Sequence, residues 1–231
     1  IVKLWRLGET AVPPRQALPD EAFLDQPPDR ARLVALSCPW LGEEHPDWTD
    51  APLHARRSGN HLATIAPLLE AYCRQPTTDS AGRVAPSAVG VYWDYLSVYH
   101  DARGSMLSPA QQKLHVRGLD AAAYLFAHTE VSVWLQTRLS GQEDLHMGAA
   151  SGQVQWNDAN AFKSRGHSLL HLHLASLCTP STKVLDLGRL PRGTRLESLV
   201  DFHAQVANVC SMSAKQPSRG VNAMRFPPIV T

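Results

Sequence analysis

Residues 33–36 read Leu-Val-Ala-Leu, and three later stretches of the chain share this short apolar character. Apolar residues at helical spacing occupy the intervals between the stretches. Strands alternating with helices are typical of an open α/β domain, in which helices cover both faces of a parallel sheet. We therefore predict a single α/β domain with an open parallel sheet of four or five strands. The expected strands are Leu33–Leu36, Ala88–Trp93, Val131–Leu135 and Lys183–Leu187.

The helices are predicted from apolar periodicity and capping residues. Residues 60–73 repeat apolar side chains at helical spacing. The clearest start is Ser108-Pro109-Ala110-Gln111, where a capping serine, a proline and a capping-box glutamine open a helix that runs to about His128. Gly166–Cys178 is apolar around most of its circumference, so we expect this helix to be well buried, and a last helix is expected at about Leu196–Cys210. In the Ser108 helix, the stripe expected to face the sheet is Leu114, Gly118, Ala121, Ala122 and Leu125.

Composition indicates one globular domain and excludes several classes of protein. The 231 residues are 44% hydrophobic and 19% charged, which suits a chain with a substantial core. A net charge of +1 gives no reason to expect nucleic acid as a partner. No apolar stretch reaches the roughly 20 residues of a membrane-spanning helix, which leaves peripheral association with a membrane complex as the membrane contact to consider. The four cysteines form no CxxC pair, so neither a zinc ribbon nor a disulfide framework is expected, and we predict no cofactor.

Prolines set the ends of the chain apart from its centre. Residues 1–30 form a Pro-rich arm that we expect to pack on a surface, 31–210 form the α/β domain, and 211–231 form an irregular tail. The sequence begins at Ile1 rather than Met, so an upstream segment is expected to be missing. A removed targeting peptide would allow an organellar location within the cell, and the compartment stays unknown.

Polar side chains follow the first two predicted strands at their carboxyl ends. Ser37 and Trp40 come after the first strand, and Asp94 and Ser97 after the second. The carboxyl ends of parallel strands border the crevice in which open sheets bind ligands, and hydroxyls with a carboxylate suit a ribose. The alternative is that Asp94 and Ser97 only cap a turn or the next helix.

Several of these stretches resemble one family of domains. Residues 35–40, with Ser-x-x-Trp, and 92–97, with Asp-x-x-Ser, are similar to motifs of a protist and algal group of Toll/interleukin-receptor-like (TIR-like) domains. The resemblance begins at residues 18–23 and continues through Arg165-Gly166 and the following helix to residues 184–187, so it covers most of residues 18–190. It implies a flavodoxin-like sheet, shared with nucleoside deoxyribosyltransferases and with TIR domains that cleave NAD.

The family's helix motif reads Arg-Gly-Trp-Cys-x-x-Glu, and in catalytic members its glutamate contacts the ribose and supports cleavage of the glycosidic bond. In this chain His167, Ser168 and His171 stand at the Trp, Cys and Glu positions. An imidazole lacks the negative charge that stabilises an oxocarbenium-like centre. The resemblance therefore implies a non-catalytic accessory or scaffold subunit, a pseudoenzyme held in a larger protein assembly. The alternatives are an enzyme of N-glycosidic bonds that uses Asp94, Ser97 and His171, or a nucleotide-binding sensor.

Two further patterns concern metals and partners. His167 and His171 have the i, i+4 spacing of a zinc pair, but no third ligand lies in register, so no metal is expected. Aromatic residues in irregular segments suit contacts with other protein subunits, because a rigid ring buries much area at a small entropic cost. The alternative is that these rings fold back onto the domain itself. The predicted partner contacts are Trp5, Trp48, Trp156 and Phe226.

Overall fold

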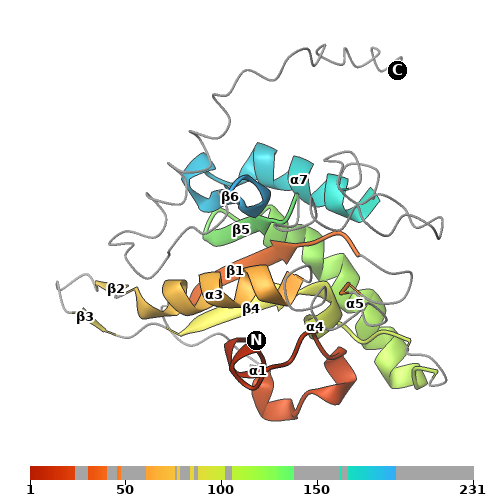
Figure 1. Cartoon of the computed structure of the whole chain (residues 1–231). Coiled ribbons are helices and arrows are strands. Elements are labelled where there is room, and N and C mark those ends of the chain that lie inside the picture. The colour runs from red at the N-terminus through yellow and green to blue at the C-terminus, as the bar shows by residue number, and fades with distance from the viewer. Residues whose placement is uncertain are drawn as a thin grey trace, which may run out of the picture.

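A computed structural model describes residues 1–23, 31–40, 46–47, 61–75, 77–78, 84–85, 88–101, 106–137, 162 and 166–190. Its centre is a four-stranded sheet in which every neighbouring pair of strands is parallel (Figure 1). The spatial order is β4-β1-β5-β6, so the first strand in the chain is internal. The prediction of an open parallel sheet is confirmed. The strands are β1 (Arg32–Ser37), β4 (Val89–Trp93), β5 (Val131–Leu135) and β6 (Val184–Asp186).

The strand order is that of a doubly wound open sheet. Counted along the chain, the four strands lie in the order 2-1-3-4, so the chain reverses its direction of winding between β1 and β5. The crevice outside the carboxyl ends of these two strands is the ligand site of such sheets. A separate antiparallel pair joins β2 (Thr77–Thr78) and β3 (Val84–Ala85).

The structure describes five helices, of which the three longest lie close to their predicted positions and the two shortest were not predicted. They are α1 (Val2–Arg6), α3 (His61–Arg74), α4 (Asp94–Ser97), α5 (Pro109–Phe126) and α7 (Gly166–Cys178). The capping box at the start of α5 is formed in both directions: the Gln111 N–H donates to the Ser108 hydroxyl, and the Ser108 N–H donates to the Gln111 side chain. Four 3₁₀ turns complete the described elements: η1 (Arg15–Ala17), η2 (Asp20–Ala22), η4 (Ser181–Lys183) and η5 (Leu187–Arg189).

Several boundaries differ from the predictions: β1 extends one residue further at each end, to Arg32 and Ser37, and β4 begins at Val89 rather than Ala88. Lys183 and Leu187, expected at the ends of the last strand, belong to η4 and η5. Residues 94–97, predicted as the polar end of the second strand, form the single helical turn α4. The expected helix at 196–210 and the tail at 211–231 lie outside the described residues.

The sheet separates two hydrophobic clusters, and β1 supplies side chains to both. Val34 and Leu36 join the cluster on the α3 side, whereas Ala35 packs with Phe126 of α5 and Ala175 of α7. This alternation is the period of two that a strand imposes, and it confirms that helices cover both faces. In the part of the chain that the structure describes, no helix is long and apolar enough to span a membrane.

The amino-terminal arm packs on the domain's own surface. Helix α1 lies against α3, and Arg6 forms an ion pair with Glu70 of that helix (Figure 1). Ile1, Val2, Trp5 and Leu18 pack against the α3-side cluster, and Val12, 2% exposed, belongs to it. On this side of the sheet the arm therefore forms an outer layer over α3.

Candidate functional site

The carboxyl edge of the sheet brings Ser37 and His171 together, although they lie 134 positions apart. Ser37 is the last residue of β1 and is 2% exposed, and its carbonyl accepts the Gln136 N–H that follows β5. His171 lies on the buried face of α7, with its Nδ1 atom 3.1 Å from the Ser37 hydroxyl oxygen. The pair thus occupies the point between β1 and β5 at which an open sheet of this order binds ligands.

The His171 ring is held by an aromatic stack as well as by this hydrogen bond. Its centroid lies 3.7 Å from that of Phe126, with the two planes 13° apart. Burial, and secondarily the neighbouring His167, lower the pKa of His171 from the ordinary value of 6.5 to about 4. The imidazole is therefore neutral at physiological pH and carries no negative charge toward the crevice.

Asp94 lies at the end of β4, where it begins the α4 turn. One carboxylate oxygen accepts the Tyr95 N–H at 2.7 Å, and the other accepts the Trp40 indole N–H at 3.2 Å. Desolvation raises the pKa of the Asp94 carboxyl, while these two hydrogen bonds and the nearby His100 and His167 act in the opposite direction. Among the predicted site residues, Trp40 and Asp94 are thus brought into direct contact.

Aromatic rings surround the Asp94 end of this edge. Trp40 meets the ring of Tyr95 edge-on at 5.5 Å, and Tyr95 stacks on His100 at 5.3 Å. His100 donates through Nε2 to the Asp94 carbonyl at 3.1 Å, and its ring lies 5.5 Å from that of His115. The sequence pattern singled out Trp40 here but neither histidine, because both come from later segments.

Ser97 closes the turn that Asp94 opens. Its hydroxyl oxygen accepts the Trp93 N–H at 3.0 Å, so it completes the backbone hydrogen bonding of α4. This is the local role considered as the alternative to ligand binding. Asp186 does the same at the end of β6, where its carboxylate accepts the Gly188 N–H at 3.1 Å and the Thr137 hydroxyl.

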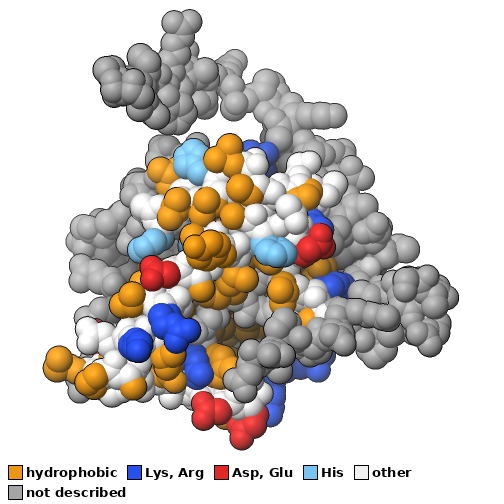
Figure 2. Space-filling model, turned by 180° about the vertical axis from the view of Figure 1, so that it is seen from behind, with side chains coloured by type: hydrophobic (Ala, Val, Ile, Leu, Met, Phe, Trp, Pro, Cys, Tyr) orange, Lys and Arg blue, Asp and Glu red, His pale blue; other side chains and the backbone are white. Residues whose placement is uncertain are grey.

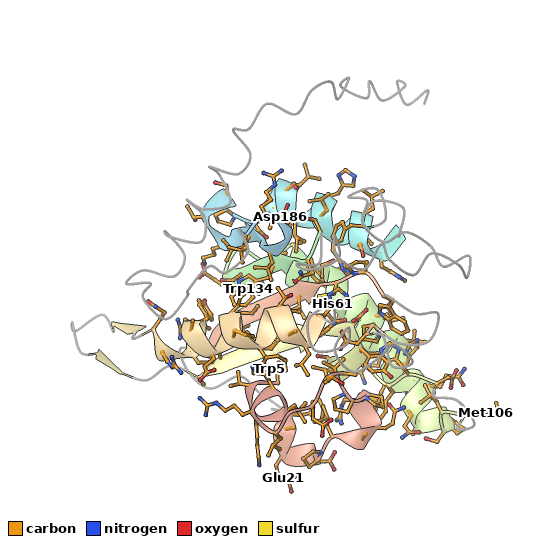
Figure 3. The ribbon with its side chains drawn as sticks, viewed as in Figure 1. Trp5, Glu21, His61, Met106, Trp134 and Asp186 are labelled. Atoms are coloured by element: carbon orange, nitrogen blue, oxygen red, sulfur yellow. The ribbon has the colours of Figure 1, made fainter. Side chains whose placement is uncertain are left out.

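Sequence reasoning missed a buried carboxylate beside this edge. Asp47 is 1% exposed and accepts the Val12 N–H at 3.0 Å and the His61 N–H at 2.6 Å, thereby joining the arm to the start of α3 (Figure 3 labels His61 there). Burial raises its pKa to about 7, although the backbone hydrogen bonds lower it. Because Asp47 precedes His61 by fourteen positions, it lacks the local spacing of a helix cap, and no sequence pattern points to it.

The remaining predicted residues divide into two groups. Trp5 is half-buried against the α3-side cluster (Figure 3), so its ring contacts the domain itself, and its role toward a partner stays a prediction. Trp48, Trp156 and Phe226 lie outside the described residues. The rings of His167 and His171 lie 6.5 Å apart, and within the described ranges no group of three His, Cys, Asp or Glu side chains could hold a metal ion.

The chain was compared with known proteins at three levels. No protein family, no curated protein and no solved structure was found to match it. The TIR-like resemblance therefore stays a prediction that rests on the residues quoted for it.

Proposed function

We propose that this domain is a non-catalytic, TIR-like accessory or scaffold subunit of a larger protein assembly. The observation that supports it most is the Ser37–His171 hydrogen bond, with His171 stacked on Phe126 at the switch point of the sheet. The side chains that would face a ribose there instead bond and pack against each other. A ligand entering at this point would have to break a buried hydrogen bond and displace a stacked ring.

The charge at this point also favours a non-catalytic role. Cleavage of an N-glycosidic bond leaves positive charge on the sugar, which a carboxylate stabilises and a neutral imidazole does not. His171 is neutral at physiological pH, because burial lowers its pKa to about 4. At the place where the resembling family keeps a glutamate, this chain supplies no negative charge.

One observation favours the alternative of an N-glycosidic enzyme or a nucleotide sensor. Asp94 has a raised pKa and lies within an aromatic and histidine-rich group, a combination that often marks active sites. Both carboxylate oxygens accept hydrogen bonds from the protein itself, which also fits a structural role.

Incubation of the purified protein with NAD, and separately with deoxynucleosides, tests the proposal. We expect no release of nicotinamide or free base above the buffer control. Turnover that disappears in Asp94→Ala and persists in Asp120→Ala, which replaces an exposed aspartate of α5, would establish the enzyme instead. Binding of NAD without turnover, measured by calorimetry, would favour the sensor.

The variant His171→Glu asks whether the imidazole is what prevents catalysis. It returns a carboxylate to the position where the family motif has one. Turnover that appears only in this variant would support a pseudoenzyme that retains the rest of the site. Co-purification from cells followed by mass spectrometry addresses the other half of the proposal, the assembly.

A further inference from the structure

Arg15 of the arm is a largely enclosed cation that lacks a hydrogen-bond acceptor. Its side chain is only 14% exposed, and the ion pair that the described residues give it is with Asp20, whose carboxylate oxygen lies 4.0 Å from the Nη2 atom. That separation exceeds the range of a hydrogen bond, and the Asp20 side chain is itself 97% exposed. Gln16 Oε1 is an enclosed polar atom without a partner, whereas no nitrogen of Arg15 is enclosed in this way. Within the described part of the chain, the N–H donors of Arg15 thus reach the surface unused.

Two aromatic rings hold this guanidinium in place, and we call the three side chains the arginine clamp. The Cζ atom of Arg15 lies 3.2 Å from the ring centroid of Phe23 and 4.9 Å from that of Tyr99. Phe23 ends the η2 turn, where its N–H donates to the Asp20 carbonyl at 2.9 Å, and the Tyr99 carbonyl accepts a hydrogen bond from His115 of α5. The cation is therefore oriented before any ligand arrives, which lowers the entropic cost of binding one.

We propose that the arginine clamp binds a carboxylate group that an acidic side chain of another protein subunit supplies. The planar fork of guanidinium N–H groups matches the two oxygens of a carboxylate. Such a group would accept the donors that Arg15 leaves unused within the described structure. An enclosed charge is costly when nothing pairs with it, so a bound carboxylate would also offset this cost.

Charge favours a carboxylate over a phosphate at this place. The Asp20 carboxylate lies close enough to offset part of the positive charge of Arg15, so a doubly charged anion is repelled more strongly than a singly charged one. Gln16 donates through Nε2 to the His100 carbonyl at 2.7 Å, which brings a histidine close to the clamp. Burial lowers the pKa of His100, so its ring adds no second positive charge at neutral pH.

The strength of one such contact indicates that a protein supplies the carboxylate. A single charge-assisted pair binds a free anion with a dissociation constant on the order of 100 mM. A free acid at lower concentration leaves such a site empty, whereas a protein partner adds further contacts around it. Arginine and tyrosine are enriched in the hot spots of protein interfaces, which a polar rim surrounds. Figure 3 labels Glu21 of η2 at the lower end of the molecule, and Figure 2 shows charged side chains of both signs gathered toward that end.

Binding of acetate tests the clamp itself. The arginine Nε–H signals of the nitrogen-labelled full chain are followed by NMR while acetate replaces chloride at constant ionic strength, and Arg15→Lys assigns the Arg15 signal by its loss. We expect a saturable shift at Arg15, with a dissociation constant on the order of 100 mM, and none at Arg117, an exposed arginine of α5 that serves as the control. Phe23→Leu keeps an apolar side chain without the aromatic face and should weaken binding about threefold. Absence of saturation at Arg15, or tighter binding of phosphate than of acetate, would overturn the proposal.

The source of the carboxylate rests on the proposed function, since the partner is a subunit of the same assembly. Co-purification of the tagged full chain, followed by quantitative mass spectrometry, compares Arg15→Lys with the control Arg117→Lys. Arg15→Lys keeps the charge but loses the fork, so we expect recovery of a partner subunit to fall about tenfold, while Arg117→Lys leaves recovery unchanged. Circular dichroism confirms that each variant is folded. Recovery that is unchanged in Arg15→Lys would overturn this inference alone, whereas an unaltered chain that recovers no subunit would contradict the proposed function as well.

Discussion

The two sides of the sheet are covered in different ways. On the α3 side, the arm adds an outer layer that is tied down by polar contacts: Asp47 accepts the Val12 N–H, and Arg6 pairs with Glu70. On the α5 and α7 side, the described residues place helices directly against solvent, with Leu177 and Tyr124 among the most exposed apolar side chains. Among the described residues, the chain forms an outer layer over the α3 side, the covered side, and forms none over the α5 and α7 side, the uncovered side.

On the uncovered side, the largest effect is expected from a comparison of a buried with an exposed aromatic side chain of α5. Phe126 is fully buried in α5 beneath His171, whereas Tyr124, two positions earlier, is 78% exposed. Phe126→Ala should lower the free energy of unfolding by about 3–5 kcal/mol, because it leaves a cavity and removes the stack. Tyr124→Ala should change it by less than about 0.5 kcal/mol. Urea denaturation measures both, and similar losses would contradict the assigned orientation of α5.

On the covered side, the largest expected effect belongs to Asp47. Asp47→Ala leaves the Val12 and His61 N–H groups without their acceptor, so the free energy of unfolding should fall by about 1–3 kcal/mol. Asp20→Ala, which removes an exposed carboxylate from the same arm, is the control and should leave stability unchanged. If hydrogen exchange at Val12 were no faster in Asp47→Ala, the carboxylate would not anchor the arm.

The helix α5 and the contacts of Asp47 also show what the sequence could predict and what it could not. The start of α5 was predictable, because the capping box is local chemistry within four residues. The orientation of α5 was predictable only in part: Ala122 of the expected stripe is buried, but Leu114 of the same stripe is 48% exposed, and the fully buried Phe126 lies outside the stripe. Two apolar stripes compete on this helix, and only its packing against the sheet decides between them.

The candidate site likewise contains residues that the sequence could place and one that it could not. Sequence placed Ser37 and Asp94 at neighbouring strand ends, because parallel strands end at one edge. It could not place Asp47, whose partners are set by how the arm and α3 meet in space. The apolar composition of α7 indicated that the helix surface is buried, which is wrong for Leu170 and Leu177, because both are exposed. Composition does not say whether the same chain or a second molecule buries such a surface.

The pH dependence of stability extends the comparison, because each side of the sheet holds a group whose shifted pKa affects stability between about pH 4 and 7: Asp47 on the α3 side and His171 on the other. Asp47 has its pKa raised from 3.8 to about 7, so between these values the folded protein keeps a proton that the unfolded chain releases. Its contribution to stability therefore falls as pH rises from about 4 to 7. His171 has its pKa lowered from 6.5 to about 4, so the unfolded chain binds a proton that the folded protein does not. Its contribution is full above 6.5 and is lost as pH falls toward 4.

The two slopes oppose each other, and each amounts to at most about 1.4 kcal/mol per pH unit. The measured quantity is the slope of the free energy of unfolding against pH between about 4 and 6.5. Relative to the unaltered protein, Asp47→Ala should raise this slope, and His171→Gln should lower it. Urea denaturation across this range measures both differences, which cancel the contributions of groups common to all three proteins. Slopes that change in the same direction in both variants would contradict the opposite shifts.

The smallest effect concerns Trp5, where the arm's own packing and a partner contact make different predictions. Its ring is half-buried against the α3-side cluster, so Trp5→Ala should lower the free energy of unfolding by about 1 kcal/mol in the isolated protein. Leu7→Ala, at a position that is 69% exposed in the same arm, should change it by less than about 0.5 kcal/mol. A ring kept mainly for a partner would give the reverse pattern: unchanged unfolding of the isolated chain, and loss of co-purifying proteins. The arm would then serve mainly as a contact surface and not as a cover for α3, and the contrast between the two sides of the sheet would no longer hold.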